Sequence, residues 1–288
     1  MITAADVLLL LALQKHGIRK MEALIVMLVF TVGACYVVEI FLAQPEWGPM
    51  LHGLVTPRLN SESLYVAMGI LGATVMPHNL YLHSALVQSR KVERTDEQLR
   101  QAARYNLIDS AVALNMAFFV NAAILVMSAA VFHRNGVEVK ELSEAHATLA
   151  PLVDTALSST LFAVALLCAG QSSTLTGTLA GQIVMEGFLR IRIRPWMRRL
   201  ITRALAIIPA AAVIAIQGEQ GTYKLLILSQ VILSLQLPFA IVPLVQFTSS
   251  RDKMGAHANP TWLKVAAWAV AAFIISLNVW LLKLTLLG

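Results

Sequence analysis

The stretch that decides the fold is Gly72-Ala73-Thr74-Val75-Met76-Pro77-His78-Asn79, which lies inside the apolar run of residues 62–89. Proline has no amide hydrogen for the carbonyl four residues earlier, and its ring crowds that carbonyl. Pro77 therefore predicts a helix break that frees the carbonyl oxygen of Ala73. At the depth of a bilayer, such an oxygen is tolerated only where protein buries it or where it lines a cavity for water, ion or substrate.

The composition is typical of an integral membrane protein. The chain has 288 residues, of which 58% are hydrophobic and 13% charged, against roughly 45–50% and 25% in soluble domains. About seven apolar stretches approach the ~20 residues that span a bilayer; they cover approximately residues 21–44, 62–89, 104–132, 156–189, 200–216, 223–247 and 262–287. A shorter stretch, about residues 2–13, is interpreted as the second half of a further helix. We expect residues 1–288 to form one transmembrane transporter domain.

The positions of Lys and Arg predict the orientation of the chain. Most of the 22 Lys and Arg residues fall in alternate linkers, within Lys15–Lys20, Arg90–Arg104, Arg190–Arg203 and Arg251–Lys264. Because cytoplasmic loops carry an excess of positive charge, these linkers are predicted to be cytoplasmic and the C-terminus outside, in a multi-pass protein of the cell membrane. The net charge of +6 then reflects topology and anionic lipid of the bilayer, and we expect no nucleic-acid partner.

Two side chains beside the proline suit metal and proton chemistry. Met76 offers a thioether, and His78 carries a ring whose charge changes near neutral pH, which suits a proton relay. A thioether combined with carbonyl and amide oxygens favours Mn²⁺, Fe²⁺ or Co²⁺ over Mg²⁺ and Ca²⁺, which prefer oxygen ligands alone. Gln230, in the stretch 223–247, would supply the amide oxygen. These residues predict a pathway in which divalent metal ions are the substrate and no resident cofactor is needed.

Two other polar residues have more than one interpretation. Glu39, late in the stretch 21–44, is either a structural hydrogen-bonding group or part of a path for protons or ions, because intramembrane charge is costly and usually faces a partner or a cavity. His83 either extends a polar path towards the cytoplasm or hydrogen-bonds a neighbouring helix. No H-E-x-x-H, G-x-S-x-G or P-loop pattern occurs, which is unfavourable to an enzyme.

The run Met76-Pro77-His78-Asn79-Leu80-Tyr81-Leu82-His83-Ser84 resembles the signature of a broken helix in the natural resistance-associated macrophage protein (NRAMP) family of divalent metal transporters. Four other stretches resemble the family in the same order, at residues 33–39, 169–174, 177–182 and 229–234. The resemblance implies an all-α membrane protein with a LeuT-like inverted-repeat transporter fold. It also implies uptake of Mn²⁺ or Fe²⁺ coupled to protons.

The resemblance further implies roles for individual residues. The thioether ligand would be Met76, the carbonyl ligand Ala73, and the glutamine that closes on the metal Gln230. His78 resembles the motif histidine of proton handling. Arg90, Arg198 and Arg199 resemble basic residues that line the inner end of a proton route, although by themselves the three arginines indicate only topology. Glu39 and His83 are candidates for the same route on the grounds given above.

One motif of the family is not found. The Asp-Pro-Gly-Asn motif, which supplies carboxylate and amide ligands, does not occur in the 288 residues. The resemblance covers roughly the fourth to the eleventh helix, so we expect an N-terminally truncated fold whose missing helices are partners from the same protein. A dication facing only neutral donors has its desolvation poorly compensated. We therefore expect these residues alone neither to bind metal tightly nor to transport it.

Two alternative functions stay open. A transporter of the same fold would bind amino acids or organic cations at the helix break, using the exposed N–H groups for a carboxylate, although sulfur adds nothing to anion binding. A non-transporting scaffold or receptor would use its polar residues only to pack helices, as the Gly177 and Gly181 spacing allows.

Overall fold

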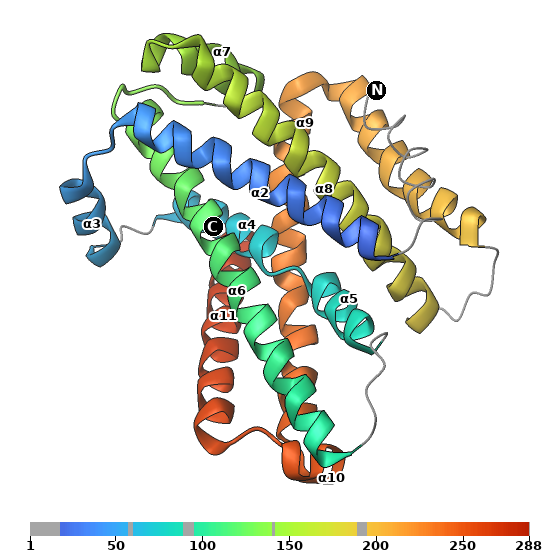
Figure 1. Ribbon diagram of the computed structural model, residues 1–288. Coiled ribbons are helices and arrows are strands. Elements are labelled where there is room, and N and C mark those ends of the chain that lie inside the picture. Colours follow the sequence, from blue (N-terminus) through green and yellow to red (C-terminus); the bar gives the residue numbers. More distant parts are fainter. Residues whose placement is uncertain (1–17, 57–59, 89–94, 140–141, 189–194, 288) are drawn as a thin grey trace. The chain divides into compact units, whose positions relative to one another are not determined.

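The structure is a computed structural model that describes residues 18–56, 60–88, 95–139, 142–188 and 195–287. Every regular element in this described part is a helix (Figure 1). The helices gather into two compact units. The first takes its residues from Met1–Thr56 and Val87–Gln182, and the second takes its residues from Pro57–Leu86 and Ile183–Gly288.

Five helical segments of the described chain are long and apolar enough to cross a membrane: Glu22–Ala43, Asp96–His133, Ala156–Met185, Lys224–Ser249 and Thr261–Lys283. They coincide with five of the stretches predicted from the sequence. The stretch 62–89 is absent from this set because two shorter helices replace it. The stretch 200–216 forms part of a longer helix, and the partial stretch 2–13 lies outside the described residues.

The first unit contains α2 (Ile18–Ala43), α3 (Trp47–Val55), α6 (Asp96–Ser128), the π-helical turn η1 (Ala129–His133), α7 (Leu142–Val153) and most of α8 (Ala156–Phe188). Its core draws apolar side chains from α2, α6, η1, α7 and α8, among them Val32, Tyr36, Met127, Phe132, Leu149 and Phe162. The Ser159 hydroxyl donates a 2.7 Å hydrogen bond to the His146 carbonyl, which joins α7 to α8.

The second unit contains α4 (Ser61–Thr74), most of α5 (Pro77–Gln88), α9 (Pro195–Ser249), α10 (Arg251–Met254), the 3₁₀ turn η2 (Gly255–His257) and α11 (Thr261–Leu287). A capping box begins α4: the Ser63 N–H donates to Asn60 Oδ1 at 2.7 Å, and the Asn60 N–H donates to Ser63 Oγ at 2.9 Å. Helices α4, α9 and α11 then share an apolar core made by Leu64, Met68, Val231 and Leu281.

The stretches 200–216 and 223–247, predicted as separate segments, belong to the single helix α9. A straight helix of its 55 residues would be about 80 Å long, more than twice the ~30 Å hydrocarbon core of a bilayer. The ribbon of α9 changes direction between its two halves (Figure 1). Helical hydrogen bonds continue through the region where the sequence predicts a linker. One bent helix therefore replaces the two predicted segments, as long helices are rarely straight.

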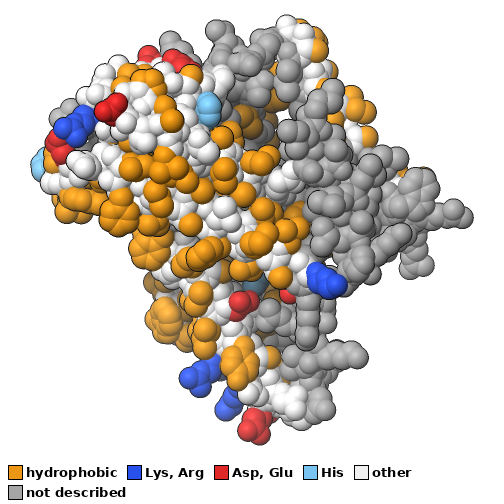
Figure 2. All heavy atoms as spheres, turned by 45° about the horizontal axis from the view of Figure 1, so that its top comes forward, with side chains coloured by type: hydrophobic (Ala, Val, Ile, Leu, Met, Phe, Trp, Pro, Cys, Tyr) orange, Lys and Arg blue, Asp and Glu red, His pale blue; other side chains and the backbone are white. Residues whose placement is uncertain are grey.

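The described surface is strongly apolar. In Figure 2 hydrophobic side chains cover much of the face in view, and few charged side chains interrupt them. Among the exposed large apolar residues, Phe41 is 76% exposed, Leu107 70% and Phe239 82%. Soluble proteins rarely expose large contiguous apolar patches, so this surface agrees with the membrane protein that the composition predicts.

Candidate metal site

The predicted helix break is present, because α4 ends at Thr74 and α5 begins at Pro77. The residue before a proline is disfavoured in the helical conformation, which favours the end of α4 before Met76. Pro77 takes the first position of α5, where its missing N–H costs nothing. The Val75 N–H still closes the last turn of α4 on the Leu71 carbonyl at 2.9 Å, and the Asn79 N–H donates to the Met76 carbonyl at 3.0 Å.

Two potential metal ligands lie at this break. Ala73 lies exposed in the last turn of α4, Met76 lies partly buried between the helices, and Pro77 is buried. The helical partner of the Ala73 carbonyl would be the amide of residue 77, which as proline has no hydrogen to donate. The freed carbonyl therefore lies in the last turn of α4, and the thioether lies in the short non-helical connection that follows it.

Helix α9 meets the end of α4 at Gln230. Gly72 is buried, and a side chain there would overlap the carbonyl oxygen of Gln230 and approach the carbonyl carbon to 2.8 Å and Ser234 N to 3.0 Å. The last turn of α4 thus rests directly on the backbone of α9. Gln230, which the sequence offers only as an amide in a distant segment, is brought next to the residue that precedes Ala73.

The amide of Gln230 has an unused acceptor. Its Oε1 is shielded from solvent and has no hydrogen-bond partner in the part of the chain that the structure describes, whereas Nε2 lies 3.4 Å from Ser229 Oγ. An unsatisfied buried acceptor costs about 1–3 kcal/mol. A cation would relieve that cost. The donors here are neutral, and within the described ranges no group of three or more His, Cys, Asp or Glu is arranged to hold a metal ion.

The residues predicted to handle protons lie in both units. In the second unit, His78 is half-buried at the start of α5 and His83 is exposed further along the same helix. In the first unit, Glu39 on α2 is 1% exposed, and neither carboxyl oxygen has a hydrogen-bond partner among the described residues. The structural hydrogen bond considered for Glu39 is therefore not observed in that part of the chain.

The three arginines of the predicted proton pathway stay predictions. Arg90 lies outside the described residues. Arg198 and Arg199 belong to α9, in a stretch whose side chains the structure does not describe.

A buried polar contact that the sequence analysis missed holds α9 against α11. Asn278 Nδ2 donates to the Ser234 carbonyl at 3.2 Å and to the Ile274 carbonyl at 3.1 Å. The Ser234 hydroxyl, in turn, lies 3.3 Å from Asn278 Oδ1. Both residues are buried. The sequence signal for this contact was the amide side chain of Asn278 inside the largely apolar span Thr261–Lys283, because such a group needs a partner at bilayer depth.

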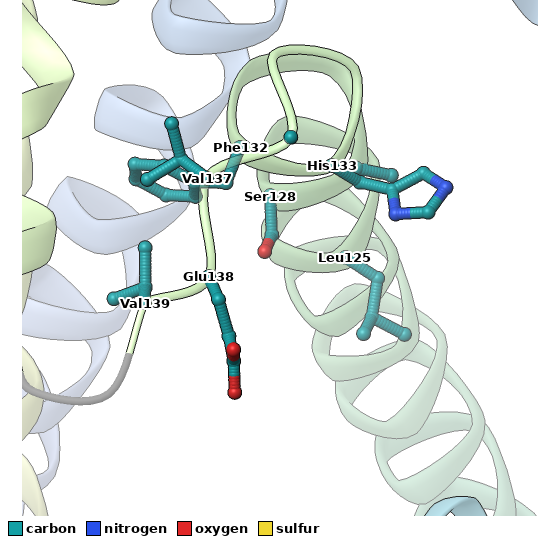
Figure 3. Close-up of a pocket in the computed structure, with 9 residues that line it drawn as sticks. Leu125, Ser128, Phe132, His133, Val137, Glu138 and Val139 are labelled. Carbon is teal, nitrogen blue, oxygen red and sulfur yellow. The ribbon is translucent and has the colours of Figure 1, made fainter.

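A surface hollow of about 600 Å³ lies in the first unit, at the end of α6, the turn η1 and the loop that follows. Figure 3 shows Glu138 extending along one side of it, while the His133 ring points away from the loop. Most of the remaining lining is apolar and includes Leu125, Phe132, Val137 and Val139. None of the predicted site residues lines it, so this hollow is not the predicted metal site.

Comparison with known proteins gives consistent matches. A family model described as natural resistance-associated macrophage protein-like matches residues 1–284. The divalent metal cation transporter MntH of Nostoc sp. is 55% identical over 291 residues, which cover 100% of this chain and 66% of the relative. MntH of Agrobacterium fabrum is 52% identical, over 98% of this chain and 62% of the relative.

Solved structures agree with these sequences. A crystal structure of a mutant of the Eremococcus coleocola manganese transporter is 40% identical with a TM-score of 0.82, and the match covers 96% of this chain and 62% of that chain. The same transporter in complex with an aromatic bis-isothiourea substituted compound gives a TM-score of 0.84.

The chain thus spans somewhat less than two thirds of the length of these relatives, from 62% to 66%. Its fold is the all-α, LeuT-like fold that the resemblance implies. The relatives are named as metal transporters and not as enzymes, in agreement with the sequence analysis. The match of the family model over nearly the whole chain, together with these identities, shows that the chain belongs to the natural resistance-associated macrophage protein (NRAMP) family.

Proposed function

We propose that this chain forms part of a secondary transporter that imports divalent transition-metal ions, Mn²⁺ or Fe²⁺, together with protons. The observation that carries the proposal is the meeting of the helix break with α9 at Gln230. The ligands offered by this chain are the Ala73 carbonyl, the Met76 thioether and the Gln230 amide oxygen. Pro77 maintains the break.

The donor set favours a borderline or soft cation. Hard cations such as Ca²⁺ and Mg²⁺ bind to oxygen-only sites, whereas a thioether contributes to the binding of later transition metals. The neutral donors leave the desolvation of a dication poorly compensated. We propose that a part of the transporter outside these 288 residues supplies a carboxylate ligand, which would complete the metal site.

Proton coupling is the finer part of the proposal. His78 directly follows the proline, so a change in its charge acts beside the proposed ligands. Glu39 is a second candidate, because a buried carboxyl without a described partner suits uptake and release of a proton. His83, Arg90, Arg198 and Arg199 would extend the route towards the cytoplasm.

The test is uptake by vesicles. We suggest a chimera that joins this chain to the part of the Nostoc sp. MntH lying outside the match, reconstituted in liposomes beside the 288 residues alone. We expect Mn²⁺ uptake by the chimera, faster with an inward proton gradient, and no uptake by the 288 residues alone. Ca²⁺ uptake should stay at the level of empty liposomes.

Other outcomes distinguish the alternatives. Uptake of alanine or choline without Mn²⁺ would indicate a transporter of organic solutes that shares the fold. A folded chimera that transports none of these solutes would favour the alternative of a non-transporting scaffold or receptor. Equal uptake of Mn²⁺ with and without the gradient would leave metal transport in place and exclude proton coupling.

A further inference from the structure

We infer that Gly72 is a positioning residue for the metal site, because its missing side chain sets the separation between the helix break and Gln230. This inference rests on the proposed function in one respect: it takes Ala73, Met76 and Gln230 to share one cation. Gly72 is not itself a ligand.

The contact at Gly72 is one of backbone against backbone. The atoms that a side chain would meet first are the carbonyl oxygen and carbon of Gln230 and the amide nitrogen of Ser234. These three nearest atoms all belong to the backbone, so no flexible side chain is the first to be met. A methyl group at residue 72 must therefore push α4 and α9 apart, since helical backbone cannot rotate aside as a side chain does.

Helix α9 is not free to yield at this turn. Ser234, whose amide nitrogen faces Gly72, is fully buried and bonded through its carbonyl to Asn278 of α11. Val231, in the same turn, packs in the core that α4, α9 and α11 share. A displacement of α9 would break this buried contact, so we expect a side chain at residue 72 to displace the end of α4 and with it the break.

Gly69 provides a matched comparison one turn earlier on α4. A Cβ there would lie 3.5 Å from Ile227 Cγ2 and 3.8 Å from Val231 Cγ2. These are ordinary van der Waals distances, the two nearest atoms belong to side chains, and the nearest backbone atom, the Ile227 carbonyl oxygen, is 4.0 Å away. Both glycines thus lie on α4 and face α9, but of the two only Gly72 has no room for a side chain.

The functional consequence follows from the short chain distance to the ligands. Ala73 is the next residue, and Met76 follows within the same connection. A misplacement of reacting or binding groups by about 1 Å can cost on the order of 10²-fold in activity. A small shift at residue 72 is therefore expected to reach metal binding without unfolding the protein.

The first measurement is uptake of Mn²⁺ by the chimera described above. Gly72→Ala should raise KM for Mn²⁺ about tenfold or more, with a normal elution profile in detergent. Gly69→Ala should leave KM within about twofold, since its new methyl group lies at ordinary van der Waals distances from its neighbours. Equal KM values for Gly72→Ala and the parent would overturn the inference.

The second measurement does not depend on transport. With Cys35→Ser and Cys168→Ser, the pair Ala73→Cys and Gln230→Cys should form a disulfide rapidly under a mild oxidant. Adding Gly72→Ala should slow this reaction several-fold, while adding Gly69→Ala should not. A parent chimera that moves no metal but shows this difference would refute the proposed function and leave the positioning role of Gly72 standing; an unchanged rate would refute that role alone.

If Gly72→Ala does not reach the membrane, Asn278→Ala replaces it in the cross-linking measurement. This variant keeps Gly72 but removes the group that holds α9, so slower cross-linking is expected. Ser276→Ala on the same helix is the control, because among the described residues the exposed Ser276 hydroxyl donates only to the Ala272 carbonyl of its own helix. Equal rates for Asn278→Ala and Ser276→Ala would contradict the inference.

Discussion

The thioether of Met76 distinguishes the proposed site from an oxygen-only site. Replacing Met76 with alanine removes the soft ligand and leaves the Ala73 carbonyl and the Gln230 amide. We expect Met76→Ala in the chimera to weaken Cd²⁺ binding by at least about tenfold, and to change Ca²⁺ binding little, because Cd²⁺ prefers sulfur and Ca²⁺ does not. Titration of both ions by calorimetry measures the difference. An equal loss for both ions would show that Met76 only packs the connection.

His78 and His83 are two titratable residues of the same helix that differ in burial and in distance from the break. Both lie on α5, but His78 is half-buried beside the break and His83 is exposed. Glutamine keeps a polar side chain without a titratable ring. We expect His78→Gln to abolish the acceleration of Mn²⁺ uptake by a proton gradient, because the group that changes charge beside the ligands is gone.

The same experiment with His83→Gln decides between its two interpretations. Retained acceleration would indicate that His83 lies outside the proton route, and its loss would place His83 on it. Acceleration that survives in His78→Gln would remove the assigned role of His78. The measurement is the ratio of initial uptake rates with and without the gradient.

At the scale of helices, Pro77 maintains the separation of α4 from α5. In Pro77→Ala an amide hydrogen becomes available for the Ala73 carbonyl, and the ring no longer crowds that carbonyl. We expect the two helices to join, the carbonyl to be lost as a ligand, and Mn²⁺ uptake to fall by at least about tenfold. Vesicle uptake measures the loss, and circular dichroism measures the gain in helix.

A second proline serves as the control for this change. Pro151 lies inside α7 in the first unit, away in sequence from every proposed ligand. Pro151→Ala also restores an amide hydrogen to a helix, but α7 is already continuous at this residue, so the change should leave helix content and Mn²⁺ uptake largely unchanged. Mn²⁺ uptake that falls equally in both variants would contradict a specific role for the break.

At the scale of the whole chain, the alternation of basic linkers predicts which loops face the cytoplasm. Gly48 on α3 is exposed with open space for a side chain, and Lys253 on α10 is exposed in a basic linker. In a background without Cys35 and Cys168, we expect Gly48→Cys to react with a membrane-impermeant maleimide on intact cells. Lys253→Cys should react only after permeabilisation, and the reverse pattern would invert the predicted topology.

Some properties of the whole molecule follow from the sequence because they depend on covalent structure or on local composition. Pro77 lacks an amide hydrogen and crowds the Ala73 carbonyl whatever its tertiary surroundings, so a weak point between α4 and α5 was predictable, with Met76 and Ala73 beside it. That the helix ends there was not certain, because Pro151 and Pro238 lie inside helices. The apolar stretches predicted five of the spans. The bend within α9 and the continuity of its helix were not predictable, because glycine and polar residues indicate a turn without excluding helical hydrogen bonds.

The sequence by itself determined the family, the helical class and the two donors at the break, because each depends on residues that are neighbours in the chain. Tertiary structure alone decided that Gln230 lies against the end of α4, that Asn278 holds Ser234, and that Glu39 is buried without a described partner. These facts join residues far apart in sequence. Their physical cause is close packing between helices, which depends on the shape of both surfaces at once.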